Sequence, residues 1–128
     1  MKIIKLAAAC AGLIGLCASL TAFAADRPVM RVLVVQTNDA AAYAHEVANL
    51  QAIFRKTGQQ VTLRVWRATF AGPDTGSIVV SVEVPSLTAL AQMNEALRNN
   101  AEVAAEMKRI EAMRAVTSDS IYEAVTAP

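Results

Sequence analysis

The stretch VTLRVWRATFAGPDTGSIVVSVEV, residues 61–84, decides the fold. It contains two runs in which successive side chains alternate in character, and a period of two is typical of β-strands. Between the runs lies AGPDTG, residues 71–76, whose glycines, proline and aspartate favour a turn. We therefore expect an antiparallel hairpin with one purely apolar face, formed by Leu63, Val65, Val80, Val82 and Val84.

The opposite face of this hairpin is mixed, because it carries aromatic, polar and charged side chains: Arg64, Trp66, Phe70, Val79, Ser81 and Glu83. If Phe70 faces Ser77, then Trp66 pairs with Ser81, and Arg64 pairs with Glu83. Opposite charges at facing positions are a favourable cross-strand pair, which supports this register. A shift by one residue would turn the apolar side chains of one strand to the wrong face.

The beginning of the chain has the pattern of a secretory signal peptide. Lys2 and Lys5 precede an apolar run over residues 6–20, and AFA at residues 22–24 is a small-x-small cleavage site. We predict a signal peptide over residues 1–24 and a single mature domain over residues 25–128. No later stretch approaches ~18 uninterrupted apolar residues, so we expect a periplasmic or secreted protein with no membrane association after cleavage.

Both cysteines, Cys10 and Cys17, lie in the predicted signal peptide, so the mature domain is expected to lack disulfides and thiolate metal sites. A lipid-anchored form is an alternative, although Leu16 is a poor residue before an acylated Cys17. Removing Lys2 and Lys5 from the 12 basic residues leaves 10 against 11 acidic ones, a net charge of −1. This balance argues against a nucleic-acid partner, which requires a clustered basic excess.

The residues before the hairpin predict a strand and a helix. Residues 30–36, MRVLVVQ, form an apolar, β-branched run of strand length. Thr37, Asn38 and Asp39 offer N-cap side chains, and apolar residues then recur at three- and four-residue steps over residues 40–56. Gly58 stands where a left-handed C-terminal cap is expected.

The residues after the hairpin predict two helices and a last strand. Ser86 can cap a helix with Leu90, Met93 and Leu97 inward, and residues 98–100 interrupt it. The second helix places Val103, Met107, Ile110 and Met113 inward, and Glu102, Glu106, Lys108, Arg109 and Arg114 outward. Residues 117–119 end this helix, and residues 120–125 form the last strand.

The order of elements predicts a ferredoxin-like α+β subunit, βαββαβ, with an antiparallel sheet and its helices on one face. The purely apolar face of the hairpin then lies under the helices, and the face with Trp66 and Phe70 is open. An exposed apolar patch of this kind indicates a partner surface. A second copy of the chain would cover it through a two-fold contact and form a dimeric α/β barrel.

The stretch RVWRATFAGPDTGSIVVSVEVPSLTAL, residues 64–90, resembles the second hairpin of the dimeric α/β-barrel superfamily, in particular its NIPSNAP-like and antibiotic-biosynthesis-monooxygenase-like members. The helix break at Asn99-Asn100 followed by AEVAAEMKRI is also similar to these proteins. The resemblance implies the fold and a homodimer. It implies little about activity, because the superfamily includes cofactor-free oxygenases, haem-degrading enzymes, isomerases and members without known activity.

The candidate metal and cofactor residues are few. His45 is the only histidine, and it lies off the predicted apolar stripe of the first helix, as a solvated histidine would. Haem-degrading relatives are expected to carry a histidine on or near the second helix, and this sequence has none there. The methionines follow the core stripes, and the turn GPDTG lacks the Lys-Ser/Thr of a phosphate-binding loop. We expect neither a metal nor a cofactor.

The most promising candidate site is the set Trp66, Arg64, Ser81 and Glu83 on the open face of the hairpin. In a barrel these residues would line the lumen: Trp66 could stack on a flat molecule, and Arg64 could hold an oxyanion. The interpretation that we favour is structural: Arg64 and Glu83 form an ion pair, and Trp66 fills the dimer core. Arg31 and Tyr122 are further candidates for this face, although the uniform first and last strands leave their orientation open. The sequence thus predicts an exported homodimer that binds a small molecule or a partner; the alternative is a cofactor-independent monooxygenase- or isomerase-like enzyme acting on a small aromatic or carbonyl compound.

Overall fold

A computed structural model of the chain describes residues 26–126, so the predicted signal peptide and both cysteines lie outside the described residues. Four strands and three α-helices occur within this range, and a single 3-10 turn lies in the hairpin. Their bounds are β1 (Val29–Gln36), α1 (Ala40–Lys56), β2 (Thr62–Arg67), η1 (Gly72–Asp74), β3 (Ile78–Val84), α2 (Leu87–Asn99), α3 (Ala101–Ala112) and β4 (Ala115–Glu123).

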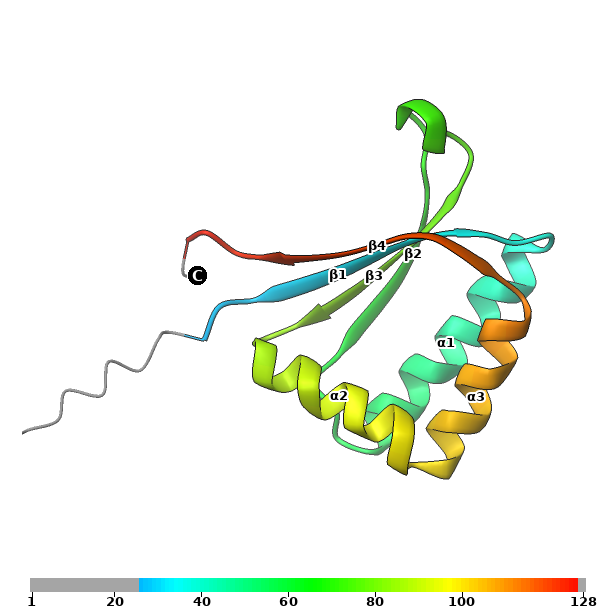
Figure 1. Cartoon of the computed structure of the whole chain (residues 1–128). Coiled ribbons are helices and arrows are strands. Elements are labelled where there is room, and N and C mark those ends of the chain that lie inside the picture. The colour runs from blue at the N-terminus through cyan, green and yellow to red at the C-terminus, as the bar shows by residue number, and fades with distance from the viewer. Residues whose placement is uncertain (1–25, 127–128) are drawn as a thin grey trace, which may run out of the picture.

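The four strands form one antiparallel sheet in the order β2-β3-β1-β4. All three helices lie on the same side of this sheet, and the other side is open (Figure 1). The arrangement is the ferredoxin-like α+β fold expected from the sequence, because β1 and β2 are parallel strands separated by β3.

Side-chain caps fix where the helices begin. The Asp39 carboxylate accepts a hydrogen bond from Ala42 N (2.9 Å), and Ser86 Oγ accepts one from Ala89 N (3.1 Å). Gly58 follows α1 with a φ of 75°, the left-handed conformation predicted for it. The described residues contain no helix that combines the length and the apolar character needed to cross a membrane.

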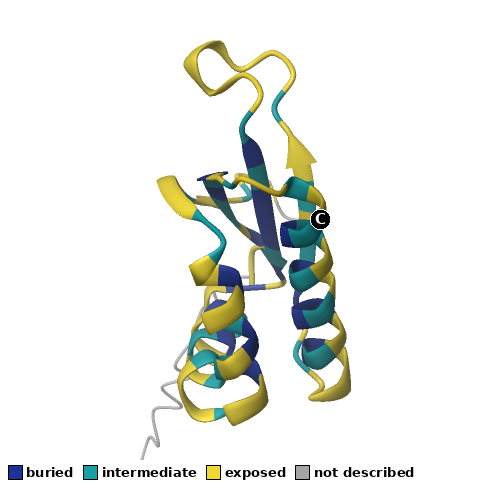
Figure 2. Ribbon diagram, turned by 90° about the vertical axis from the view of Figure 1, so that its right-hand side faces the viewer, coloured by how far each residue is buried: buried dark blue, intermediate teal, exposed yellow. Residues whose placement is uncertain are grey.

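The core lies between the sheet and the helices, where buried residues of both layers meet (Figure 2). The apolar face of the hairpin contributes to it as predicted, and Tyr43 and Phe54 are its largest aromatic side chains. The full set of buried apolar residues is Val29, Leu33, Val35, Tyr43, Val47, Leu50, Phe54, Val61, Ile78, Val80, Val82, Val84, Leu90, Met93, Val103 and Ile110.

The predicted register of the hairpin is wrong by two residues, although the assignment of its faces is correct. Trp66 pairs with Val79, and Arg64 pairs with Ser81. The connection is longer than expected because η1 forms a turn of its own and Gly76 N donates back to Ala68 O (2.7 Å). A shift of two preserves the alternation of side chains, so the apolar face still lies under the helices.

The last strand is also longer than predicted, because β4 begins at Ala115 and includes residues 117–119. It pairs with β1 along almost its whole length, and a bulge opposite Val34 and Val35 accommodates the extra residue. Thr117 Oγ1 donates to Val34 O (3.2 Å) at this point. Pairing with a central strand therefore overrides the local turn preference of Thr117, Ser118 and Asp119.

Candidate functional site

A cavity of about 180 Å³ lies inside the subunit, between the sheet and the three helices. Its wall is almost entirely apolar, and three polar side chains, Arg31, Glu111 and Arg114, line one part of it. Glu111 is exposed and both arginines are half-buried, so this polar part is the mouth. The apolar lining consists of Leu33, Tyr43, Val47, Leu50, Phe54, Leu63, Val80, Val82, Met93, Leu97, Met107 and Ile110.

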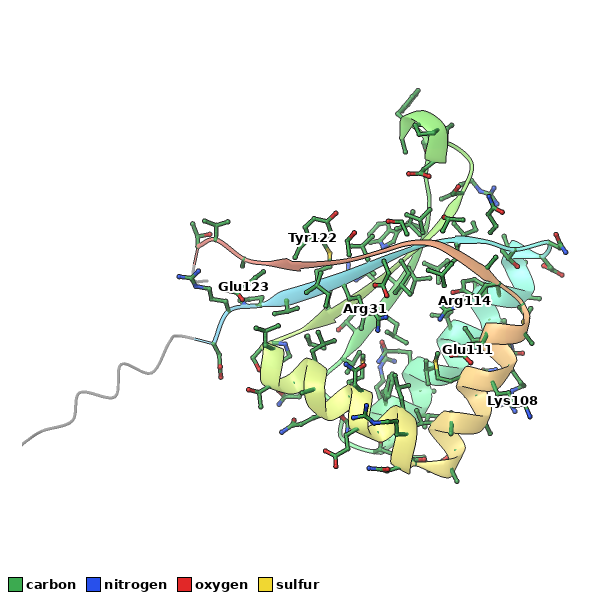
Figure 3. The ribbon with its side chains drawn as sticks, viewed as in Figure 1. Arg31, Lys108, Glu111, Arg114, Tyr122 and Glu123 are labelled. Carbon is green, nitrogen blue, oxygen red and sulfur yellow. The ribbon has the colours of Figure 1, made fainter. Side chains whose placement is uncertain are left out.

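Tyr43 brings a hydroxyl group to this cavity. Its side chain is fully buried on α1, and its hydroxyl oxygen accepts a hydrogen bond from Arg114 Nη1 (3.0 Å). Arg114 lies in the two-residue connection between α3 and β4, and its side chain turns inward below the sheet (Figure 3). The sequence pattern placed Arg114 outward, which is wrong: the helix ends before it, so the helical stripe does not apply.

Arg31 lies on the helix side of the sheet, whereas Tyr122 lies on the open side (Figure 3). Arg31 has the same parity along β1 as the buried residues Val29 and Leu33, so it does not join the open face. It binds Asp119 through two hydrogen bonds, Nε to Oδ1 (2.8 Å) and Nη2 to Oδ2 (2.5 Å). These bonds hold the pKa of the Asp119 carboxyl below its usual value, and the charge of Arg114 lowers it further.

The four residues predicted as the lumen site are brought together on the open face. Trp66 Nε1 donates to Ser81 Oγ (3.0 Å), and Ser81 Oγ donates to Glu83 Oε1 (3.3 Å). The same Glu83 oxygen lies 3.3 Å from Arg64 Nε. The ion pair expected from the sequence therefore exists, as a diagonal rather than a directly facing pair. The cavity lies on the opposite side of the sheet, where alternating residues of β2 and β3 contribute to it instead.

A second polar cluster lies between α1 and α3, and the sequence pattern missed it. Glu106 was expected to point outward, but its side chain is 2% exposed and forms an ion pair with Arg109. Its Oε1 atom is buried without a hydrogen-bond partner. Burial raises the pKa of Glu106, and the neighbouring Glu46 carboxyl raises it further. Glu106 lies one turn after Val103 and one turn before Ile110, on the apolar stripe of α3. Its burial could have been predicted from this position.

His45 is exposed at the side of this cluster, and its Nδ1 atom lies 3.4 Å from Asn49 Nδ2. The described residues contain no group of three or more histidine, cysteine, aspartate or glutamate side chains arranged to hold a metal ion.

Comparison with solved structures identifies proteins of the same fold. SnoaB, a cofactor-independent oxygenase from Streptomyces nogalater, superposes with a TM-score of 0.57 at 15% identity, covering 79% of this chain and 96% of SnoaB. A point mutant of SnoaB gives a TM-score of 0.57 at 17% identity over 78% of this chain and 95% of that chain. A conserved protein of unknown function from Bacteroides thetaiotaomicron, described as a possible oxidoreductase, gives 0.56 at 13% identity over 77% and 99%. Likeness at these identities establishes the fold and leaves the activity open.

Neither a scan of protein-family models nor a search of curated proteins finds a match to this sequence.

Proposed function

We propose that the mature protein binds a small, mainly apolar molecule in the cavity between its sheet and helices. The observation that carries this proposal is the cavity itself, which is apolar within and polar only at its mouth. This combination is the usual design of small-molecule sites, where apolar walls hold the ligand and a few polar groups orient it.

The size of the cavity sets the size of the ligand. A closed apolar cavity of about 150 Å³ is large enough to bind benzene. The cavity described here is about 180 Å³, so it suits a molecule of one ring with a small substituent.

The proposal includes a homodimer in the periplasm or outside the cell. Paired residues of an antiparallel sheet share a face, so Met30 and Tyr122 lie on the open side together with Trp66. These three side chains are 38%, 54% and 50% exposed. Such an apolar sheet surface favours a contact with a second copy, and the pattern of residues 1–24 favours export.

A cofactor-independent oxygenase or isomerase is the second candidate, and the structural likeness to SnoaB favours it. Such chemistry requires transfer of a proton from the substrate to a base, the role that Glu111 at the cavity mouth would fill, and it leaves a negative charge on the substrate. The Arg114 guanidinium at the mouth and the buried Tyr43 hydroxyl that it contacts would stabilise that charge. A protein of this kind would convert an enolisable one-ring substrate in the presence of oxygen and without an added cofactor.

The cavity can be tested with a neutral one-ring probe, benzyl alcohol. We expect it to shift the NMR signals of methyl groups that line the cavity, such as those of Leu33 and Val80. The variant Leu97→Phe should abolish these shifts, because Leu97 lines the cavity and a larger ring fills it. Leu87→Phe is the matched control, since Leu87 lies on the same helix but is 54% exposed. Shifts that are absent, or that persist in Leu97→Phe, would refute the proposal.

A further inference from the structure

We infer that the ligand of the cavity carries an anionic oxygen, such as a carboxylate or enolate, and that Arg114 is the residue that selects for it. This inference rests on the proposed function and adds the chemical class of the ligand.

Arg114 differs from the other cations of the described chain. Five of them, Arg27, Arg31, Lys56, Arg64 and Arg109, have a carboxylate within ion-pair distance. In residues 26–126, five others do not: Arg55, Arg67, Arg98, Lys108 and Arg114. Four of these five are exposed to water, and Arg114 alone is half-buried. A cation that is partly removed from water without a carboxylate in ion-pair contact is costly, and an anionic ligand would relieve that cost.

The groups nearest to Arg114 leave its guanidinium able to bind an anionic ligand. Its one side-chain hydrogen bond in the described structure goes to the neutral Tyr43 hydroxyl. The charge of Arg114 lowers the pKa of Asp119, but both oxygens of that carboxylate are already bound by Arg31. Glu111 lies at the mouth as well, exposed and beyond ion-pair distance. The guanidinium fork therefore keeps donors for a further acceptor.

The two polar groups at the inner end of the mouth, the Tyr43 hydroxyl and the Arg114 guanidinium, both offer hydrogen-bond donors. The Tyr43 hydroxyl receives the bond from Arg114, so its own hydrogen remains to be donated. No described residue accepts that hydrogen, and the surrounding wall is apolar. A ligand that enters ring first would place its head group against two donors, Tyr43 and Arg114. An oxyanion can accept from both, whereas an alcohol or amide would offer a weaker acceptor.

The test compares two one-ring probes of similar size, benzoate and benzyl alcohol, by NMR titration at pH 7. We expect benzoate to bind more tightly in the wild-type protein. Arg114→Gln should weaken benzoate by about tenfold to a hundredfold, the range for a hydrogen bond to a charged group. Binding of benzyl alcohol should change by less than about twofold, because the apolar wall is intact. Lys108→Gln is the matched control, since Lys108 is an exposed cation that points away from the cavity (Figure 3).

The outcomes separate the two proposals. If both probes bind equally well and Arg114→Gln affects them alike, the inference about the anion is wrong and the binding function stands. If neither probe binds, both proposals fail. Arg114→Lys serves where the glutamine variant does not fold: it keeps the charge but loses the planar fork, so it should retain a reduced preference for benzoate. A preference unchanged in Arg114→Lys would contradict recognition by the guanidinium.

Discussion

Replacing Glu106 by glutamine should make the protein more stable at neutral and alkaline pH. Glu106 Oε2 accepts a hydrogen bond from Arg109, whereas Oε1 is buried without a hydrogen-bond partner, and the Glu46 carboxyl is a close neighbour of the Glu106 side chain. Two ionised carboxylates offer only acceptors to each other, so a proton is needed to join them. A glutamine amide supplies that hydrogen permanently.

The magnitude follows from the unsatisfied oxygen. A buried acceptor without a partner costs about 1–3 kcal/mol, and glutamine removes this cost. Part of the gain is offset because Arg109 loses its charged partner, but the Arg109 side chain is 57% exposed and water replaces that partner well. A net gain near 1 kcal/mol would raise Tm by about 4–8 °C in a domain of this size.

The pH dependence gives the sharper assay, because Glu106 and Glu46 titrate as a pair with opposite shifts. The pKa of Glu106 is raised, so its contribution to stability is complete below pH 4.5 and is lost as the pH rises through its folded-state pKa. The pKa of Glu46 is lowered, chiefly by the neighbouring Glu106 carboxyl, so its contribution is lost only as the pH falls through its own folded value. The advantage of Glu106→Gln should therefore grow with pH.

Urea unfolding at several pH values between 4 and 8 measures this directly. The matched control is Glu102→Gln, an exposed acid earlier on α3 that pairs with Lys56, for which we expect a change within about 0.5 kcal/mol. An advantage of Glu106→Gln that is constant with pH, or a variant less stable than wild type at pH 8, would refute the shared-proton interpretation.

Two further predictions concern the open face and the cavity mouth. If the proposed dimer forms, Trp66→Lys should convert it to a monomer in analytical ultracentrifugation at micromolar concentration, whereas Leu87→Lys on the helix side should not. A wild-type protein that sediments as a monomer would contradict the proposed barrel. Asp119→Asn should flatten the acid limb of the stability curve, because the lowered pKa of Asp119 adds stability above about pH 3.8 that is lost on acidification; an acid limb identical to wild type in urea unfolding would contradict this.

The sequence was sufficient for the fold because its local signals agree with the long-range contacts. The bounds of α1 are those predicted from the spacing of its apolar residues, and Asp39 and Ser86 cap the helices as their chemistry suggests. The faces of the hairpin were also predictable, since alternation fixes them whatever the register. The register itself was not, because it depends on how many residues the turn around η1 uses.

The site was harder to predict, because it depends on which way single charged residues point. Arg31 lies two residues before Leu33 and so shares a face of β1 with it. Both faces of this strand are apolar, however, so the sequence does not show which of them lies under the helices. Glu106 could have been noticed as an acid on an apolar stripe. Arg114 lies beyond the end of α3, where neither helical nor strand periodicity applies. The set on the open face drew attention because its residues are chemically conspicuous, whereas a cavity is formed by ordinary core residues and leaves no motif.

The corner between α2 and α3 rests on one residue, Asn100. Its backbone N–H closes α2 on Ala96 O (3.0 Å), while its side-chain oxygen accepts from Glu102 N (3.0 Å) and Val103 N (3.1 Å) at the start of α3. Two helices diverge from this corner (Figure 1), and both contribute to the cavity wall, α2 through Met93 and Leu97 and α3 through Met107 and Ile110. A change in the angle between α2 and α3 at Asn100 would therefore change the width of the cavity. In related chains, a longer connection between α2 and α3 could make room for a wider ligand without any change to the residues that line the cavity.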